Sequence, residues 1–431
     1  MAKSIYIKKT LKNKLTVFLI PRKEMRTFYA NLYIKVGSAY ENSHNQGISH
    51  FLEHYHHEGT INYPNILSFY QAIEAEGLYE NAATSLFATL YWVAGSYKKA
   101  KVILEFLYEI VFRSLLPATQ LEKTKKIILN EINDFWSDPY NQFKEEMFDK
   151  RTLDKTIYNH FSFGQVDTVK KITLKDLICW KKTYYQPKNM ILTIVGRIQN
   201  NIFLLIEKFF SQLKNEREIK KIERPKVSYS DFLIHYKSNQ SDQIYFILTF
   251  PAFGYKEYSS KKVLMLYLLN YALGKSRVSS LLGILREKYH LVYYITTSIF
   301  CYPYLGMFVI RGSCHRKNLK LVMELIKKEI DRIKKVGLNE PEIKVAKNLY
   351  QRDMVDFNFE TPQQINQWVI NEYLYHKKIL MPDDYIAIIK LIRKKDVDNL
   401  ANRIFNFNKL NIGLFGDITN EEINQIKKVF L

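Results

Sequence analysis

The sequence predicts an α+β chain made of two copies of one domain. The length of 431 residues exceeds what a single hydrophobic core usually supports. Runs rich in β-branched and aromatic residues, which are typical of strands, alternate along the chain with segments typical of helices. A shift of 220 residues also places 189–210 over 409–430 without a gap, so that each half ends with a strand, a glycine and a helix.

The first half begins with strands, continues through helices and closes with a strand and a helix. Expected strands lie at 14–21, at 27–41, twice within 79–95 and at 190–196. Expected helices lie at 44–57, 66–76, 97–114, 118–147, 173–186 and 199–213. Residues 214–229 are charged, contain a proline and lack apolar periodicity, so we expect a linker there between domains at 1–213 and 230–431.

The two copies differ in one helix. In the second half, the strand expected at 243–254 is followed by a helix at 259–274 that contains neither histidine nor glutamate. At the corresponding place in the first half, residues 47–60 hold four of the ten histidines of the chain. The histidine cluster is therefore an addition to one copy and not a requirement of the fold.

Composition excludes several classes of protein. The net charge of +21 is spread along both halves, which argues against a nucleic-acid-binding protein but leaves a preference for acidic peptides open. Cys179, Cys301 and Cys314 are too few and too scattered for a disulfide framework or a cysteine metal site, so we expect a cytoplasmic protein. We expect no membrane span and no signal peptide, because no apolar run is long enough for either.

The motif His50-x-x-Glu53-His54 predicts a zinc site. Positions i and i+4 of a helix lie one turn apart on the same face, so both imidazoles can reach one ion. Zinc suits two neutral imidazoles and a carboxylate with an open fourth position, and a neighbouring glutamate can serve as general base. The alternative is a polar helix end with solvated histidines.

The stretch GSAYENSHNQGISHFLEHYHHEGT resembles the signature of the M16 family of zinc metallopeptidases, to which mitochondrial processing peptidase belongs. The matching residues are Gly37, Ser38, Glu41, Gly47, His50, Glu53, His54, Gly59 and Thr60. In this family the third zinc ligand is a glutamate on a separate helix, and KKIILNEINDFWSDP supplies Glu131, 77 residues after His54. The resemblance thus implies a Zn²⁺ ion on His50, His54 and Glu131, with Glu53 as the catalytic base; the alternative for Glu131 is an unpaired acid on an exposed helix.

Two further segments are similar to the family pattern. YENAATSLFATLY resembles the strand that pairs with an extended substrate, which implies substrate-binding roles for Asn81, Ala82, Ala83 and Thr84. An ordinary core strand is the alternative.

SRVSSLLGILREKYHLVYYITTS resembles the segment of the second domain whose arginine and tyrosine hold the scissile peptide, which implies catalytic roles for Arg286 and Tyr293. A surface salt bridge is the alternative for Arg286.

The chain departs from the family pattern at several positions. His290 stands where a glycine is usual, so we expect the turn before the following strand to differ from that of the family. Thr124 stands where an acid is often found, and the nearest glutamate is Glu122. We interpret His56 and His57 as polar residues that flank the motif, with a share in substrate binding as the alternative.

The resemblance covers the whole chain and implies both fold and function. It implies two M16-type domains, each a mostly antiparallel sheet with helices on one face, that together form half of a clamshell. It implies a zinc-dependent endopeptidase that processes peptides as a homodimer or as a heterodimer with a paralogous M16 subunit. The alternative is a catalytically silent subunit that binds peptides or serves as a scaffold.

Overall fold

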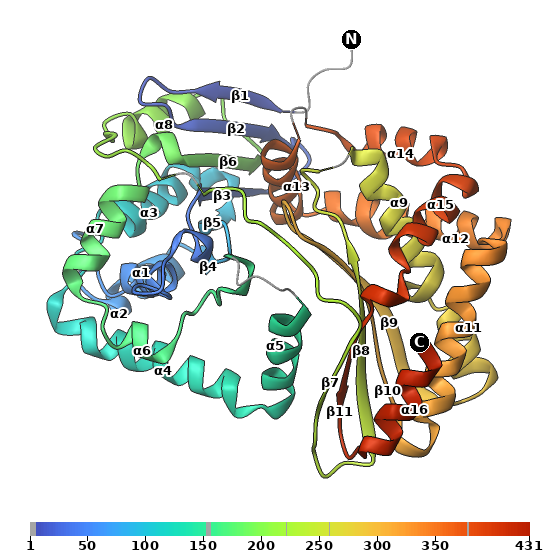
Figure 1. Cartoon of the computed structure of the whole chain (residues 1–431). Coiled ribbons are helices and arrows are strands. Elements are labelled where there is room, and N and C mark those ends of the chain that lie inside the picture. Colours follow the sequence, from blue (N-terminus) through green and yellow to red (C-terminus); the bar gives the residue numbers. More distant parts are fainter. Residues whose placement is uncertain (1–5, 152–156, 221, 258, 377–378) are drawn as a thin grey trace. The chain divides into compact units, whose positions relative to one another are not determined.

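The computed structural model describes residues 6–151, 157–220, 222–257, 259–376 and 379–431. The chain divides into two compact units, each with its own sheet (Figure 1). Unit 1 comprises Met1–Ser137, Thr156–Glu223 and Thr361–Ile370, and unit 2 comprises Asp138–Lys155, Arg224–Glu360 and Asn371–Leu431. Each unit therefore includes a short segment that lies on the other side of the expected linker at 214–229.

Unit 1 contains a six-stranded sheet in the order β1-β2-β6-β3-β5-β4. Its strands are β1 (Ile7–Thr10), β2 (Thr16–Pro21), β3 (Thr27–Ile34), β4 (Tyr79–Thr84), β5 (Thr89–Ser96) and β6 (Met190–Gly196). Only the β2–β6 pair is parallel. The helices are α1 (Ile48–His56), α2 (Ile66–Ala75), α3 (Ala100–Phe112), α4 (Leu121–Ser137), α6 (Val166–Val169), α7 (Leu174–Tyr184) and α8 (Ile202–Phe210).

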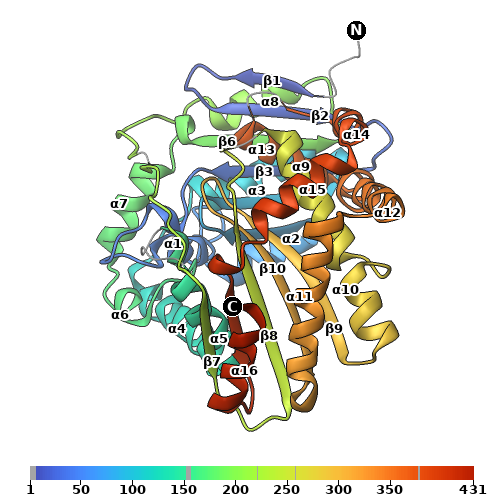
Figure 2. The same cartoon turned by 45° about the vertical axis from the view of Figure 1, so that its right-hand side comes forward.

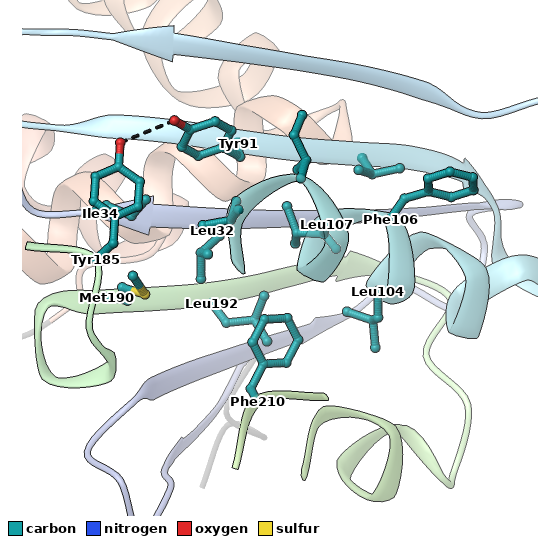
Figure 3. Packing of buried hydrophobic residues seen from close by; sticks show 14 of the residues in the cluster. Leu32, Ile34, Tyr91, Leu104, Phe106, Leu107, Tyr185, Met190, Leu192 and Phe210 are labelled. Atoms are coloured by element: carbon teal, nitrogen blue, oxygen red, sulfur yellow. Dashed lines mark hydrogen bonds between the residues drawn. The ribbon is translucent and has the colours of Figure 1, made fainter. Parts of the chain in front are cut away.

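One face of this sheet carries the main hydrophobic core. Leu32 of β3 and Leu192 of β6 meet Leu107 of α3 and Phe210 of α8, and all four are buried (Figure 3). Strand alternation sends every second side chain to this face, where each buried Leu or Phe contributes roughly 1.5–3 kcal/mol. At one end of the core Tyr185 and Tyr91 of β5 form a hydrogen bond of 3.2 Å.

Unit 2 repeats this arrangement with a five-stranded sheet in the order β7-β11-β8-β10-β9. Its strands are β7 (Leu233–Lys237), β8 (Gln243–Ala252), β9 (Val292–Cys301), β10 (Gly306–His315) and β11 (Asn411–Phe415). Its helices are α5 (Pro139–Arg151), α9 (Ser260–Asn270), α10 (Ser280–Leu282), α11 (Leu319–Val336), α12 (Glu340–Tyr350), α14 (Pro382–Leu391), α15 (Lys394–Ile404) and α16 (Asn420–Phe430). Helix α13 (Pro362–Tyr375) begins in unit 1 and ends in unit 2. Figure 2 shows α9, α11 and α15 along one face of the sheet.

The predicted duplication is confirmed. A shift of 220 residues carries the bounds of α7, 174–184, onto those of α15, 394–404, and it carries β6 and α8 onto β11 and α16. Among the described strands, the parallel pair of each sheet joins the strand of this shared helix–strand–helix unit to an early strand of the same sheet, β2 in unit 1 and β7 in unit 2. The fold is thus the expected α+β duplication with mostly antiparallel sheets.

The prediction of one helix over 118–147 is wrong, because two separate helices, α4 and α5, occupy this part of the chain. Pro139 is the first residue of α5, and proline has no N–H for a helical hydrogen bond and crowds the preceding turn. Helix α5 then packs in unit 2, where Phe143 and Met147 cover Gly413 of β11. A Cβ on Gly413 would lie 2.8 Å from the ring of Phe143, so this close approach requires glycine.

None of the helices in the described part of the chain combines the length and the apolar character that crossing a membrane requires.

Candidate metal and peptide site

Helix α1 carries the His-x-x-Glu-His motif, and a buried carboxylate fixes its beginning. Gly47, the residue before α1, has a left-handed backbone with φ of 94°, and a Cβ there would lie 2.8 Å from the Phe163 carbonyl oxygen. The Glu41 carboxylate accepts hydrogen bonds from the backbone N–H groups of Gly47 at 2.7 Å and Ser49 at 3.0 Å. An acid is well placed there, because the first N–H groups of a helix lack intrahelical partners.

Three side chains converge beside α1. Nε2 of His50 lies 3.2 Å from Nε2 of His54, and Oε2 of Glu131 on α4 lies 3.7 Å from each of these nitrogens. The potential ligand atoms of these three residues lie within 4.8 Å of one another, and no other described residues form such a cluster. The sequence-predicted ligands therefore lie together, and the side chains of His50 and His54 are only 16% and 26% exposed.

The donor set fits zinc. Two ligand atoms of a tetrahedral zinc ion are about 3.3 Å apart when each metal–ligand bond is about 2.0–2.1 Å, and the separations here are close to that value. Burial, together with the neighbouring His54, lowers the pKa of His50 to about 3. Burial, together with His57, lowers the pKa of His54 to about 4. Both imidazoles are therefore neutral near pH 7, as metal ligation requires.

Glu53 lies on the same helix, between the two histidines, and contacts β4. It is almost completely buried, with 9% of its surface exposed, and its Oε2 accepts a hydrogen bond of 2.5 Å from Oγ1 of Thr84. Burial raises the pKa of Glu53 to about 7, although the hydrogen bond from Thr84 opposes this rise. Thr84 was expected only to bind substrate, and its hydrogen bond to Glu53, the expected base, was not predicted from the sequence.

β4 is an edge strand of the first sheet, paired with β5 on one side. Tyr79, Asn81 and Ala83 are exposed, whereas Ala82 and Thr84, alternating with them, are half-buried. The N–H of Ala82 donates to Oδ1 of Asn81 at 2.8 Å. An edge strand can accept an added peptide strand through main-chain hydrogen bonds.

His56 and His57 do more than flank the motif. His56 is fully buried, and its Nδ1 lies 2.8 Å from the Tyr91 hydroxyl. His57 lies with Nε2 2.9 Å from Oε1 of Glu80 and Nδ1 3.0 Å from the Glu53 carbonyl oxygen. Burial lowers the pKa of His57, but the hydrogen bond and charge of Glu80 outweigh it, and the pKa is raised. Glu80 follows no local motif and was not recognised from the sequence.

A carboxylate also lies beside Thr124. The buried Glu58, two residues after α1 ends, accepts a hydrogen bond of 3.1 Å from Oγ1 of Thr124. Lys123 forms an ion pair with the same carboxylate at 3.1 Å. The acid that is absent at position 124 therefore has a counterpart from a different part of the chain, which only the fold reveals.

Arg286 and Tyr293 lie in unit 2. Arg286 is in the helical segment η7 (Gly283–Lys288) and makes a loose ion pair of 3.8 Å with Glu287. Tyr293 lies on the edge strand β9 and is 81% exposed. Between them His290 adopts a left-handed backbone with φ of 53°, so a histidine makes the turn that glycine usually makes. Tyr293 lines an open pocket of about 510 Å³ with Gln243, Tyr245, Tyr294 and Ser313.

Two family profiles match the chain. Residues 17–160 match the family described as Insulinase (Peptidase family M16). Residues 171–350 match the family described as Peptidase M16 inactive domain. The first match contains the three potential ligands and Glu53, and the second contains Arg286 and Tyr293.

Known proteins resemble the chain along its length. Over 400 residues it is 26% identical to an uncharacterized zinc protease of Rickettsia felis. The alignment covers 92% of this chain and 94% of the relative. Over 188 residues, 42% of this chain and 37% of the relative, it is 30% identical to the mitochondrial-processing peptidase subunit beta of Rattus norvegicus. The solved structure of a protease from Helicobacter pylori matches with a TM-score of 0.83 at 22% identity, covering 95% of this chain and 99% of that one.

Proposed function

The chain belongs to the M16 family of peptidases, and from this premise we propose that it is a zinc-dependent endopeptidase that cleaves peptides or unfolded segments. One observation carries the proposal: the donor atoms of His50, His54 and Glu131 converge on the helix that also holds Glu53 against the edge strand β4. A substrate that adds a strand to β4 binds through its main chain, which tolerates many sequences. Leader or presequence peptides, which are extended, suit such a site.

The residues of the site have distinct tasks. His50, His54 and Glu131 would hold the zinc ion, which when bound would supply a Lewis acid that makes water more acidic and polarises a peptide carbonyl. Glu53 takes the proton from the attacking water and returns it to the leaving amine. Thr84 donates to Oε2 of Glu53, which leaves Oε1 for this proton. The exposed residues of β4, Asn81 and Ala83 among them, receive the peptide.

Arg286 and Tyr293 are proposed to act from the second domain. A guanidinium can anchor a substrate carbonyl, and a phenol can donate a hydrogen bond to the oxyanion that develops at the scissile bond. We propose that the chain works as a dimer, with itself or with a paralogous M16 subunit, in which the second domain of one chain serves the zinc domain of the other. The name of one relative as a peptidase subunit supports an assembly of this kind.

A catalytically silent peptide-binding subunit is the less favoured function. The match to an inactive domain is confined to 171–350, whereas the expected ligands and base lie in 17–160 and are all present. A silent subunit would require a defect outside these four residues.

Two variants test the proposed function. Glu53→Gln should keep one zinc per chain and lose hydrolysis of fluorescein-labelled casein by a factor on the order of 10²–10⁴, because an amide cannot accept the proton. His54→Ala should lose zinc and activity together, because two remaining ligands hold the ion weakly. Zinc content is measured by elemental analysis after gel filtration.

Matched controls lie close by. Glu74→Gln on the exposed face of α2 and His44→Ala before α1 make the same chemical changes at exposed positions, and both should leave zinc and activity unchanged. Hydrolysis near the parent rate by zinc-loaded Glu53→Gln would show that Glu53 is not the base. Full zinc content in His54→Ala would remove His54 from the ligand set.

A further inference from the structure

Two side-chain pairs join helix α1 and the residue that follows it to the edge strand β4. In one, Thr84 donates to Glu53 at 2.5 Å; in the other, His57 meets Glu80 at 2.9 Å. Glu53 and His57 are one helical turn apart, and Glu80 and Thr84 are four residues apart on a strand, so each pair of positions shares a face. The first pair holds the proposed base, and the second lies at the opposite end of the peptide-binding segment 81–84.

The contacts of His57 require a proton between it and Glu80. Nδ1 lies 3.0 Å from the Glu53 carbonyl oxygen, which can only accept, so Nδ1 carries a hydrogen. Nε2 lies 2.9 Å from Oε1 of Glu80, and the contact is a hydrogen bond only when a proton lies on Nε2 or on the carboxyl. The His57 and Glu80 side chains are 13% and 2% exposed, so water contributes little to either group.

Helix α2 holds the His57 ring in place. Tyr70 stacks on it with ring centroids 6.4 Å apart and an angle of 16°, and Phe69 packs edge-on at 6.5 Å. The ring is thus fixed by α1 and α2 before it reaches β4. Glu80 is the residue through which the strand meets this fixed ring.

A gain in stability does not by itself explain why His57 and Glu80 form a buried pair. Burying a histidine and a glutamate costs solvation, and an apolar pair of similar shape is often as stable. A hydrogen-bonded pair does, however, set the position of two elements more sharply than an apolar contact. An edge strand needs such a constraint, because backbone pairing holds it on one side only.

We propose that His57 and Glu80 are positioning residues, which fix β4 so that a peptide bound along residues 81–84 presents its scissile bond to Glu53. This inference rests on the proposed function and deepens it. It assigns Glu80, together with a histidine next to the motif, to the placement of substrate and not to metal ligation.

The test first examines β4 without substrate. Glu80→Ala and His57→Ala should each accelerate hydrogen exchange of the 79–84 amides at least tenfold, with exchange in the central strand β3 unchanged. Glu80→Gln keeps the size of the side chain and one hydrogen bond to His57, and it should give a smaller effect. Glu76→Ala is the control, because it removes an exposed ion pair of 2.9 Å with Lys99 and should leave β4 unaffected.

Substrate binding is measured next, in zinc-loaded Glu53→Gln protein by fluorescence anisotropy of labelled casein. Each alanine variant should weaken binding at least tenfold at one zinc per chain. The double variant should be no weaker than the weaker single variant, because residues that act as one unit are not additive. With Glu53 intact, kcat per bound zinc should also fall at least tenfold, whereas a smaller folded fraction alone would leave this value unchanged.

Unchanged exchange in β4, unchanged affinity for casein, or losses that multiply in the double variant would each overturn the proposal. Failure of the proposed function is seen separately, because the parent protein would then not cleave casein while the exchange experiment would still report on β4.

Discussion

His50 and His54 face each other as neutral imidazoles, whereas His57, one turn further on, lies between a carbonyl oxygen and a carboxylate. The three side chains share a residue type and lie close together in the sequence, yet their surroundings shift their pKa values in opposite directions. Burial with a neighbouring histidine lowers the pKa of the first two, and Glu80 raises that of the third in spite of burial. Local surroundings therefore decide which of these histidines can ligate a metal.

Lys181 allows a test of how burial shifts a pKa. Its Nζ lies 2.5 Å from the Ser114 hydroxyl, and burial lowers the pKa of Lys181 to about 7 from its usual 10.5. The unfolded chain then binds more protons between pH 7 and 10.5, so the free energy of unfolding rises with pH through this window. Between pH 7 and pH 9.5, the free energy of unfolding of the parent should rise by at most about 3 kcal/mol more than that of Lys181→Met. This limit follows from about 1.4 kcal/mol per pH unit. Urea denaturation of both proteins measures this difference, and parallel curves would contradict it.

The spacing of residues explains which parts of the site could be predicted. His50, Glu53 and His54 lie within one helical turn, so their common face follows from helix geometry. Glu131 was placed by resemblance. Glu80 reaches the site from a strand, and no local sequence pattern predicts its role. Its contact with His57 depends on how β4 packs against α1.

Elements were predicted best where the periodicity was uninterrupted. α7 and α15 agree with the repeat, whereas the continuous helix expected over 118–147 overlooked Pro139. The segment η7 shows a milder conflict, since the turn that follows it uses His290 with a positive φ. Left-handed backbone costs an L-residue about 1–2 kcal/mol, so this turn is made against local preference.

His290→Gly should therefore stabilise the protein. The free energy saved by removing a side chain from the left-handed backbone exceeds the cost of the greater entropy of glycine in the unfolded chain. We therefore expect the free energy of unfolding to rise by about 0.5–1 kcal/mol. The side chain is exposed, so little packing is lost. Lys288→Gly, within the helical segment, is the control and should destabilise by about 1 kcal/mol. Thermal unfolding measures both, and a lower melting temperature for His290→Gly would refute the argument.

At the scale of the whole molecule, α5 is an essential part of unit 2. Phe143 is fully buried, stacks on His235 of β7 at 5.9 Å and packs on Gly413 of β11. Glu146 adds a hydrogen bond with His235 and an ion pair with Lys237. Residues that precede the first domain's closing strand thus pack on the second domain's sheet, which a division of the sequence at 214–229 could not show.

Phe143→Ala should destabilise unit 2 by about 3–5 kcal/mol. Hydrogen exchange in β7 and β11 should accelerate as a result. All four tryptophans, Trp92, Trp136, Trp180 and Trp368, lie in unit 1. Tryptophan fluorescence therefore follows unit 1 and should change less, whereas Leu107→Ala in the unit 1 core should shift it. Equal loss of both signals in Phe143→Ala would show that the units unfold as one.

The proposed dimer predicts complementation between two defective subunits. Glu53→Gln lacks the base but keeps Arg286, and Arg286→Ala keeps the base. In a mixed homodimer with sites completed across subunits, one site carries both defects and the other carries neither. After random exchange of equal amounts, about a quarter of all sites should be intact, by the symmetry of a two-fold assembly. Activity near that fraction is expected; none, despite demonstrated exchange, would mean completion within one chain or by a paralogue.

The order in which α5 and its sheet occur along the chain has a consequence during synthesis. α5 ends about 80 residues before β7 begins, and β11 comes near the end of the chain. At about 5–20 residues per second, a ribosome needs roughly 4–16 s to add the residues between α5 and β7. During this time Phe143 and Met147 emerge on a nascent helix whose partner strands do not yet exist. Unit 1 includes residues 361–370, so it also cannot be completed until this later part of the chain has been synthesised. Neither unit can finish folding on the ribosome before most of the chain has been translated, so nascent chains of this protein expose an apolar helix face that a chaperone can bind.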